Sequence, residues 1–262
     1  MIKLTEVSNE NVKAPTLILI PGGPGLSSLT LRSMDILSRS FNLVYVDFPG
    51  VNGNPYTVDR SFDELSHELQ MELQKINGPL YVLGHSYGGF FAANLSVKMK
   101  LDGIICVATP FSDKSLIAAG ENFNANKSQA LTDAEVEWSE QQDDKSFAKW
   151  TSEYGELYFT NPDGKYLLLN DKVSAKFFLA NRSDARQKES MLSLLKENNI
   201  KKLFIAGGKD IMLPIEILRE DASRGGFDFK SVNNASHFVT FDQAEIVAGQ
   251  IEFFCDKRIE GN

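Results

Sequence analysis

The stretch Leu80-Tyr81-Val82-Leu83-Gly84-His85-Ser86-Tyr87-Gly88-Gly89 decides the fold, because an apolar run passes directly into Gly-x-Ser-x-Gly and then into a helical pattern. The bare pattern is weak evidence, since Gly and Ser are common residues. A serine on a sharp strand-to-helix turn needs neighbours without side chains where the chain doubles back, and Gly84 and Gly88 meet that need. The stretch therefore predicts a nucleophile elbow carrying Ser86, with a plain strand-helix turn as the alternative.

Short apolar runs rich in β-branched residues alternate with segments of helical periodicity on both sides of this stretch. The expected strands are 16–20, 43–47, 80–83, 103–108 and 202–206, with a weaker one at 227–232, and the expected helices include 63–76, 89–99 and 242–254. Such alternation is typical of βαβ units with a mostly parallel sheet. We therefore expect an α/β fold, with that sheet flanked by helices.

The alternation stops between residues 111 and 200, although this interval holds both tryptophans. About 90 residues are too many for a structureless loop in a compact domain. We therefore expect residues 111–200 to form an inserted helical cap, and residues 1–110 and 201–262 to form the core.

Composition limits the range of functions. The chain has 262 residues, 42% of them hydrophobic, which suits one large domain or a domain with an inserted subdomain. A formal charge of -8 disfavours nucleic acid, so a small molecule or short peptide is the expected partner. No apolar run reaches membrane-spanning length and no signal peptide is evident, which predicts a cytoplasmic protein. Cys106 and Cys255 make a poor disulfide framework, and the oligomeric state stays open.

A serine nucleophile needs a base, usually a histidine that a carboxylate orients. Of the three histidines, His67 lies in a predicted helix and His85 directly precedes Ser86, so its side chain should leave the turn in another direction. His237 follows the weak sixth strand and precedes the last helix, at the carboxyl edge of the sheet. His237 is therefore the predicted base.

The acid should precede the histidine in the chain when the serine sits on such an elbow. Asp210 fits, because an apolar strand ends at Gly207-Gly208 and delivers it to the same edge of the sheet. Asp113 is the rival position, and Asp210 could instead cap a helix near Pro214.

The segment Pro21-Gly22-Gly23-Pro24-Gly25 follows the first strong strand. Small residues let backbone N–H groups approach a substrate oxyanion, which makes Gly23 one candidate donor and the N–H of Tyr87 the other. A phosphate-binding loop is a weak alternative because neither a Walker pattern nor Gly-x-Gly-x-x-Gly is present, and a simple turn is another.

Together these residues resemble the capped α/β-hydrolases, and within them the proline iminopeptidase-like group, over nearly the whole chain. The resemblance is carried by Pro21-Gly22-Gly23-Pro24-Gly25, which is similar to the family's His-Gly-Gly-Pro-Gly oxyanion loop, by Val46-Asp47-Phe48-Pro49-Gly50, by the Ser86 elbow, by Gly207-Gly208-Lys209-Asp210 and by Ser236-His237. It implies a triad of Ser86, Asp210 and His237, no metal or cofactor, and a helical cap inserted after the strand that ends near Ala108.

Two positions depart from the family pattern: Pro21 stands where the family usually has His, and Phe48 stands near a position where Arg is common. Family aminopeptidases bind the substrate's free amine with acidic cap residues. The resemblance makes Glu156 a candidate for that role, with a solvated helix residue as the alternative.

Aromatic residues of the expected cap could line an apolar substrate pocket, or they could form the cap's own core. They are Trp138, Trp150, Tyr154, Tyr158 and Phe159, of which Trp150 and Tyr158 are the candidates for substrate binding.

The expected function is a serine hydrolase that forms an acyl-enzyme and cleaves a small or medium carboxylic ester or amide. One alternative is an aminopeptidase of the proline iminopeptidase type, which must neutralise a buried ammonium with cap carboxylates. The other is a ligand-binding receptor without catalysis on the same fold.

Overall fold

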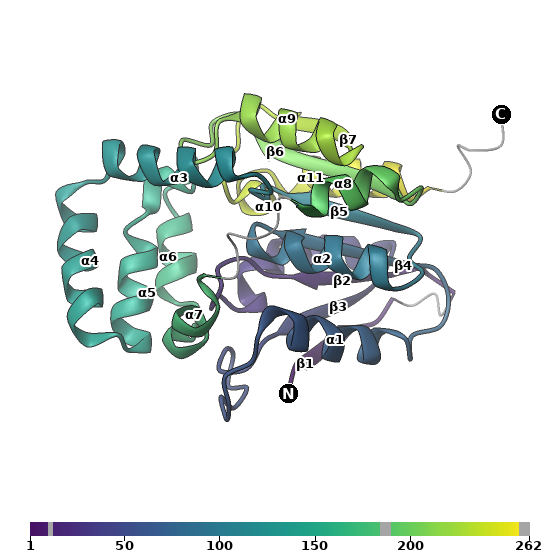
Figure 1. The fold of residues 1–262 in the computed structure, drawn as a ribbon, viewed down its shortest axis with the longest axis horizontal. Helices are drawn as coiled ribbons and strands as arrows, with labels where there is room; N and C mark the ends of the chain where they lie inside the picture. The colour runs from purple at the N-terminus through teal and green to yellow at the C-terminus, as the bar shows by residue number, and fades with distance from the viewer. Residues whose placement is uncertain (10–12, 184–189, 257–262) are drawn as a thin grey trace.

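A seven-stranded sheet runs through the protein in the order β1-β3-β2-β4-β5-β6-β7 (Figure 1). The computed structural model describes residues 1–9, 13–183 and 190–256. The strands are β1 (Lys3–Val7), β2 (Thr16–Ile20), β3 (Asn42–Asp47), β4 (Leu80–His85), β5 (Gly103–Val107), β6 (Lys201–Gly207) and β7 (Asp228–Val232). Only the pair β1 and β3 is antiparallel among these seven strands, and this confirms the predicted α/β fold with a mostly parallel sheet.

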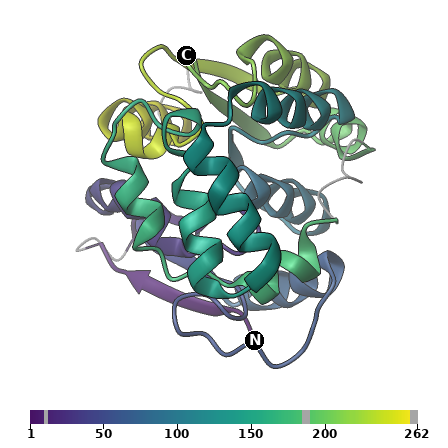
Figure 2. The same cartoon turned by 90° about the vertical axis from the view of Figure 1, so that its left-hand side faces the viewer.

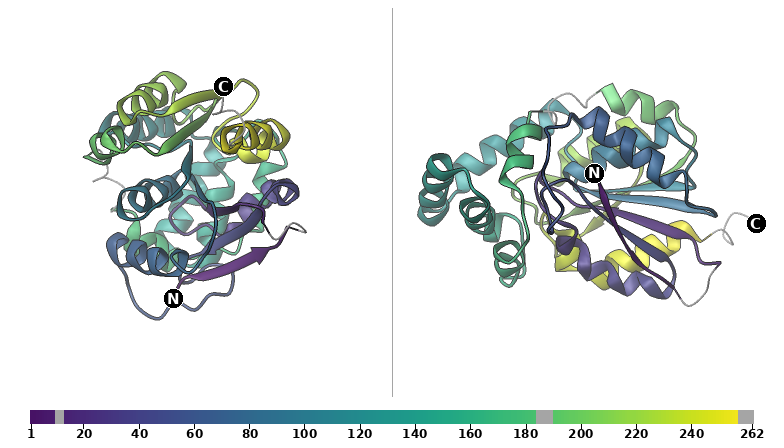
Figure 3. Two further views of the ribbon diagram at one scale, coloured as in Figure 1. Left: turned by 90° about the vertical axis from the view of Figure 1, so that its right-hand side faces the viewer. Right: turned by 90° about the horizontal axis from the view of Figure 1, so that it is seen from below.

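Helices cover both faces of the sheet (Figure 3). One face carries α1 (Phe62–Leu73), α2 (Tyr87–Lys98), α8 (Ser190–Glu197) and α9 (Ile215–Gly225), and the other carries η1 (Ser28–Arg39), α10 (Val239–Asp242) and α11 (Ala244–Cys255). Successive strand side chains point to opposite faces, so in β2 Ile18 and Ile20 enter one core while Leu17 and Leu19 enter the other. This two-sided burial explains why the central strands read as continuous apolar runs.

A group of helices between β5 and β6 lies beyond the carboxyl ends of the parallel strands (Figures 1 and 2). We refer to α3 (Asp113–Asn126), α4 (Gln129–Gln141), α5 (Asp144–Ser152), η2 (Gly155–Leu157), α6 (Gly164–Leu169) and α7 (Ala175–Asn181) as the helical segment. It has its own buried cluster, which includes Trp138, Phe147 and Leu168. The next helix, α8, packs instead against α2 and α9 beside the sheet.

Side-chain caps divide the helical segment into short helices. Ser112, Ser128, Asp143 and Ser174 stand at the N-caps of α3, α4, α5 and α7, and each side chain accepts a backbone N–H from the first turn of its helix. Such caps satisfy N–H groups that have no acceptor within the helix.

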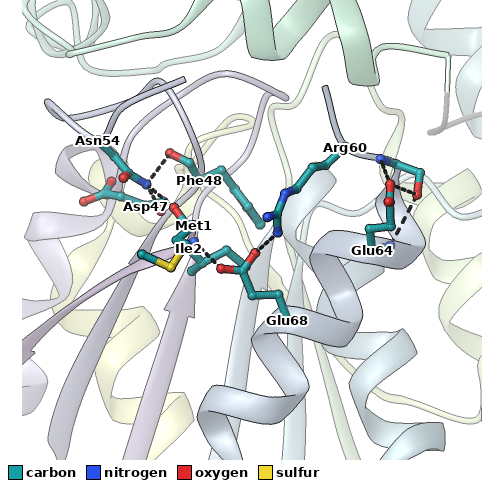
Figure 4. A network of polar contacts seen from close by, with 9 residues as sticks. Met1, Ile2, Asp47, Phe48, Asn54, Arg60, Glu64 and Glu68 are labelled. Carbon is teal, nitrogen blue, oxygen red and sulfur yellow. Dashed lines mark hydrogen bonds and ion pairs between the residues drawn. The ribbon is translucent and has the colours of Figure 1, made fainter. Parts of the chain in front are cut away.

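The N-terminal strand β1 was not among the predicted strands, because its side chains are only partly buried and give little apolar signal. It is tied down beyond its pairing with β3 (Figure 4). The Asn54 side chain donates to the carbonyl oxygens of Met1 (2.8 Å) and Asp47 (3.1 Å), while Glu68 on α1 accepts the N–H of Ile2 at 2.8 Å. These contacts join the edge strand to the loop after β3 and to α1.

Glycines allow the backbones of β2, β4 and α2 to approach closely at the carboxyl edge of the sheet. A Cβ on Gly84 would lie 2.2 Å from the carbonyl oxygen of Gly88, and a Cβ on Gly88 would lie 2.3 Å from that of Ile20. Both obstacles are backbone atoms that cannot swing aside. The glycines of the elbow are therefore a steric requirement of this fold.

Replacing Gly88 with Ala should lower the free energy of unfolding by about 2 to 3 kcal/mol, because the added methyl group overpacks rigid backbone. The matched control is Gly249→Ala in α11, where nothing lies within 4 Å of the added atom. That change should leave stability equal or raise it by up to about 1 kcal/mol, since Ala favours helix. Urea unfolding of both variants tests this, and equal unfolding free energies would contradict it.

Candidate active site

The candidate site lies where the strand order reverses. Strands β2 and β4 are neighbours in the sheet. After β2 the chain passes to β3 on one side, and after β4 it passes to β5 on the other side. The loops that follow β2 and β4 therefore leave two neighbouring strands in opposite directions. Ile20 and Gly84 are register partners at these two strand ends. Open α/β sheets bind ligands at such a point, outside the carboxyl ends of the strands.

Ser86 occupies a strained backbone position between β4 and α2. Its φ of 50° and ψ of -117° lie outside the regions that L residues ordinarily adopt. The conformation is held by two backbone hydrogen bonds: the Ser86 N–H donates to Val107 O at 2.7 Å, and Ser86 O accepts from Gly89 N at 2.9 Å. The side chain is therefore presented at the head of α2, at the wall of a cavity.

Asp210 and His237 form a hydrogen bond of 2.9 Å between Oδ2 and Nδ1, and both side chains are buried. Asp210 lies in the loop after β6, and His237 lies in the loop after β7. A carboxylate can only accept, so Nδ1 of His237 carries the proton and Nε2 is left able to take one. The rival acid, Asp113, is exposed in the first turn of α3.

The second oxygen of Asp210 holds its own loop. Oδ1 accepts the N–H groups of Met212 and Leu213, each at 2.9 Å, just before α9 begins. Asp210 does not cap the helix near Pro214, because Pro214 itself stands at the N-cap of α9 and no side chain caps that helix. The second oxygen instead holds the turn between β6 and α9, so each oxygen of the carboxylate faces a different partner.

His85 points toward the backbone of the His237 loop. Its Nε2 donates to the carbonyl oxygen of His237 at 3.0 Å. Burial, and secondarily the proximity of His237, lower the pKa of His85 to about 3, so the ring is neutral at physiological pH. The remaining histidine, His67, is exposed on α1.

The helical segment is hydrogen-bonded to the loop that carries His237 and stacks on its imidazole. Leu157 O accepts from the Ser236 hydroxyl at 3.1 Å, and Tyr158 O accepts from the N–H of Phe238 at 3.0 Å. The Tyr158 ring stacks on the His237 imidazole, with 4.8 Å between centroids and 25° between planes. The imidazole is thus positioned by Asp210 through a hydrogen bond and by Tyr158 through its ring.

One candidate oxyanion donor, Tyr87, follows Ser86 in the chain, and the other, Gly23, lines the same cavity as Ser86. Gly23 has a φ of 112° and lines the cavity. Tyr87 is the first residue of α2, and N–H groups in the first turn of a helix point beyond its N-terminus. Its ring is buried against Phe90 and Phe91 on the far side, so the residue faces the site through its backbone.

The two residues at which the chain departs from the family pattern are both buried. Pro21 is buried, and its carbonyl oxygen would lie 2.6 Å from a Cβ on Gly88. Phe48 is 2% exposed and stacks on Phe177 of α7 with 5.2 Å between centroids. The phenyl ring at this position therefore joins the helical segment to the core.

Asp171, between α6 and α7, fastens the helical segment to the loop after β2. Its carboxylate accepts the N–H of Ser27 at 2.9 Å and also the Ser27 hydroxyl. The neighbouring Ser28 donates in the same way to the buried Asp47, from its N–H at 2.8 Å and its hydroxyl at 3.0 Å. Burial raises the pKa of Asp171 to about 6, against the opposing effect of the Ser27 hydrogen bonds.

A cavity of about 90 Å³ lies between the helical segment and the strand ends. Its described lining residues are Gly23, Pro24, Leu26, His85, Ser86, Phe147, Trp150, Thr151, Tyr154, Tyr158, Phe178, His237 and Phe238. None of these described residues is Asp, Glu, Lys or Arg. The described lining is therefore largely aromatic and contains neither a carboxylate nor a Lys or Arg side chain.

The predicted substrate-binding residues are distributed unevenly. Trp150 and Tyr158 line the cavity, as does Tyr154, whereas Trp138 and Phe159 pack in the buried cluster of the helical segment. Glu156 belongs to η2, and its side chain lies outside the described part of the structure.

Two general features of the described residues bear on ligand classes. Within residues 1–9, 13–183 and 190–256, no three side chains of His, Cys, Asp or Glu come together as a metal site. No helix within the same ranges combines the length and apolar character needed to span a membrane.

Known proteins with a similar sequence or fold were found by comparison. The model of the alpha/beta hydrolase family matches residues 17–250. A serine carboxypeptidase-like protein of Arabidopsis thaliana is 30% identical over 136 residues, which cover 45% of this chain and 70% of that protein.

Solved structures share the fold across almost the whole chain. A proline iminopeptidase-related protein of Thermus thermophilus superimposes with a TM-score of 0.74 at 18% identity, covering 97% of this chain and 92% of that one. An esterase of Exiguobacterium antarcticum gives 0.70 at 14% identity, covering 97% and 96%. A proline iminopeptidase of Mycobacterium smegmatis gives 0.69 at 16% identity, covering 97% and 94%.

The raised pKa of Asp171 predicts how the free energy of unfolding depends on pH. Because its pKa is raised in the folded protein, the native state binds more protons than the unfolded state between about pH 4 and 6. Its contribution to stability is thus fully present below about pH 4 and is lost as the pH rises through about 6. Between pH 4 and 8, the unfolding free energy of wild type should fall by up to about 3 kcal/mol relative to Asp171→Asn.

The measurement is urea unfolding at several pH values, with Asp163→Asn as the control, because Asp163 is exposed ahead of α6 and makes no side-chain cap there. The control should follow wild type across the range. A difference between wild type and Asp171→Asn that does not vary with pH would refute the assignment.

Proposed function

This chain belongs to the alpha/beta hydrolase family, and we propose that it is a hydrolase that uses Ser86 as its nucleophile and passes through an acyl-enzyme. The observation that carries the proposal is the Asp210–His237 hydrogen bond at the cavity that Ser86 lines. A buried carboxylate bonded to Nδ1 is what a catalytic histidine needs, because it fixes the tautomer and stabilises the imidazolium that forms.

In the acylation half-reaction, His237 Nε2 takes the hydroxyl proton of Ser86 while the serine oxygen attacks the carbonyl carbon of the substrate. Asp210 keeps the Nδ1 proton and balances the charge of the imidazolium. The tetrahedral intermediate then collapses, and His237 returns the proton to the departing alcohol. Ser86 is left esterified.

The negative oxygen of that intermediate is bound by the N–H groups of Gly23 and Tyr87. A donor of this kind contributes on the order of 3 kcal/mol to transition-state stabilisation in comparable sites. The positive end of the α2 dipole adds to this effect, because Tyr87 opens the helix.

In the deacylation half-reaction, a water molecule replaces the alcohol. His237 removes one of its protons as the water oxygen attacks the acyl carbon, and the proton then passes to the oxygen of Ser86 as the bond breaks. The acid is released and the free hydroxyl of Ser86 is restored. No metal or cofactor takes part in these steps.

The helical segment acts as a cap over the site. We assign this role to α3–α7 of the inserted region 111–200, since α8 packs beside the sheet. The cap supplies most of the aromatic lining of the cavity, and it bonds to the His237 loop at Leu157 and Tyr158. Covering the site excludes bulk water and strengthens the electrostatic interactions within it.

The lining favours a small, uncharged acyl ester as the substrate. An aminopeptidase would bury an ammonium group, which needs a nearby carboxylate. The described lining offers none, and the side chain of Glu156, the candidate for that role, lies outside the described part of the structure. We therefore prefer a carboxylic-ester hydrolase to an aminopeptidase. The Asp210–His237 pair favours an enzyme over a ligand-binding receptor without catalysis. A cytoplasmic location stays a prediction.

The test uses purified wild type, Asp210→Asn and Asp113→Asn on p-nitrophenyl esters of short acids and on aminoacyl p-nitroanilides. Wild type should hydrolyse the esters and not the anilides. Asp210→Asn should lower kcat about 10³- to 10⁴-fold, because an amide stabilises the wrong tautomer of the histidine. Asp113→Asn should stay within about twofold, since Asp113 is exposed in α3.

Thermal melting of both variants controls for folding. A selective loss in Asp113→Asn would identify Asp113 as the acid. Hydrolysis of the anilides at rates above those of the esters would overturn the substrate assignment while leaving the triad in place.

A further inference from the structure

Tyr154, between α5 and η2, lines two hollows of the structure. One is the cavity of about 90 Å³ that Ser86 lines, and the other is a larger pocket of about 430 Å³. We call the second the outer pocket, and its described lining includes Leu131, Glu153, Leu157, Lys165 and Ile211. Among the described lining residues Tyr154 is shared by both hollows, so it forms part of the partition between them.

Other aromatic rings hold the Tyr154 ring in place. It stacks on Tyr158 with 4.4 Å between centroids and 20° between planes, and on Phe123 with 5.2 Å and 28°. It also meets Trp150 edge to face, with 5.5 Å between centroids. Tyr158 and Trp150 themselves line the cavity. Removing the Tyr154 ring would therefore enlarge the cavity on the side of the outer pocket.

Phe178, on α7, marks the opposite end of the cavity. A Cβ on Gly25 would lie 3.1 Å from the Cβ of Phe178, so this residue lies beside the loop that holds Gly23. The Trp150 ring lies 5.7 Å from that of Phe178 and 5.5 Å from that of Tyr154. The aromatic lining thus extends from the Gly23 loop, past Trp150, to Tyr154.

The proposed mechanism orients an ester between these two ends. The departing alcohol takes its proton from His237 Nε2, so the alcohol part lies on the His237 side of the reacting carbon. Tyr158 stacks on the His237 imidazole at 4.8 Å, and Tyr154 stacks on Tyr158. The alkyl chain of the alcohol therefore extends toward Tyr154. The acyl chain diverges from it at the reacting carbon and extends toward Phe178.

We propose that Tyr154 is a specificity-determining residue that closes the alcohol end of the cavity and limits the length of the alcohol's alkyl chain. The inference rests on the proposed ester hydrolysis and adds the size of the leaving alcohol to it. The outer pocket behind Tyr154 suits a longer chain, because Glu153 and Lys165 are paired there at 2.8 Å and three apolar side chains share its lining: Leu131, Leu157 and Ile211.

The experiment compares hexyl acetate with ethyl hexanoate, two isomers that carry the long chain on opposite sides of the ester. Alkyl alcohols are used because they need the proton of His237 to depart, whereas p-nitrophenolate leaves without it. Tyr154→Ala should raise kcat/KM for hexyl acetate relative to ethyl hexanoate about tenfold or more, since an apolar chain gains a pocket. Acid release is titrated at constant pH on one preparation, so a partial loss of folded enzyme cancels in the ratio.

Two further variants grade the effect by side-chain size. Tyr154→Leu should raise the ratio less than Tyr154→Ala does, and it carries the same test if the alanine variant does not fold. Tyr154→Phe keeps the ring and should leave the ratio within about twofold of wild type.

Phe178→Ala is the matched control, because it removes a ring from the other end of the same cavity and Phe178 is not among the described lining of the outer pocket. It should leave the ratio unchanged or lower it. An unchanged ratio in Tyr154→Ala and Tyr154→Leu, or an equal rise in Phe178→Ala, would overturn the assignment of Tyr154 and leave the ester hydrolase standing. Failure of wild type to hydrolyse ethyl acetate would overturn the proposed function and this assignment together.

Discussion

The close approach of three backbone segments at the carboxyl edge of the sheet is the constraint on which the site depends. Gly84 and Gly88 allow the ends of β2 and β4 and the start of α2 to pack at distances that a Cβ would forbid. Ser86 is thereby held at φ 50° and ψ -117°, with its hydroxyl at the cavity and the helix N-terminus behind it. Strain of this size persists only because the surrounding structure over-determines it.

The helical segment is coupled to the site through two separate contacts. Leu157 and Tyr158 bind the loop that carries His237, and Asp171 binds Ser27 after the glycine-rich loop. A shift of these helices would therefore move His237 and the loop that holds Gly23 together. Through these contacts the aromatic lining, the imidazole of His237 and the Gly23 loop are positioned relative to one another.

The sequence predicted the parts of this arrangement that have local signals. Apolar runs identified six of the seven strands among the described residues. Elimination and loop position singled out His237, and chain order then singled out Asp210. The edge strand β1 gives a weak signal because none of its side chains is fully buried. No sequence signal marks Asp171, because its partner Ser27 lies 144 residues away and no motif surrounds it in the chain. The stacking of Tyr154 on Tyr158 and of Tyr158 on His237 likewise depends on tertiary packing.

The central claim is that Ser86 is activated by His237, and covalent labelling tests it most directly. Wild-type protein is treated with a fluorophosphonate, which reacts with activated serines, and the adduct is located by peptide mass spectrometry. The account predicts a single adduct per chain, on Ser86, and none in Ser86→Ala. An adduct on another serine, or an unlabelled wild type, would contradict it.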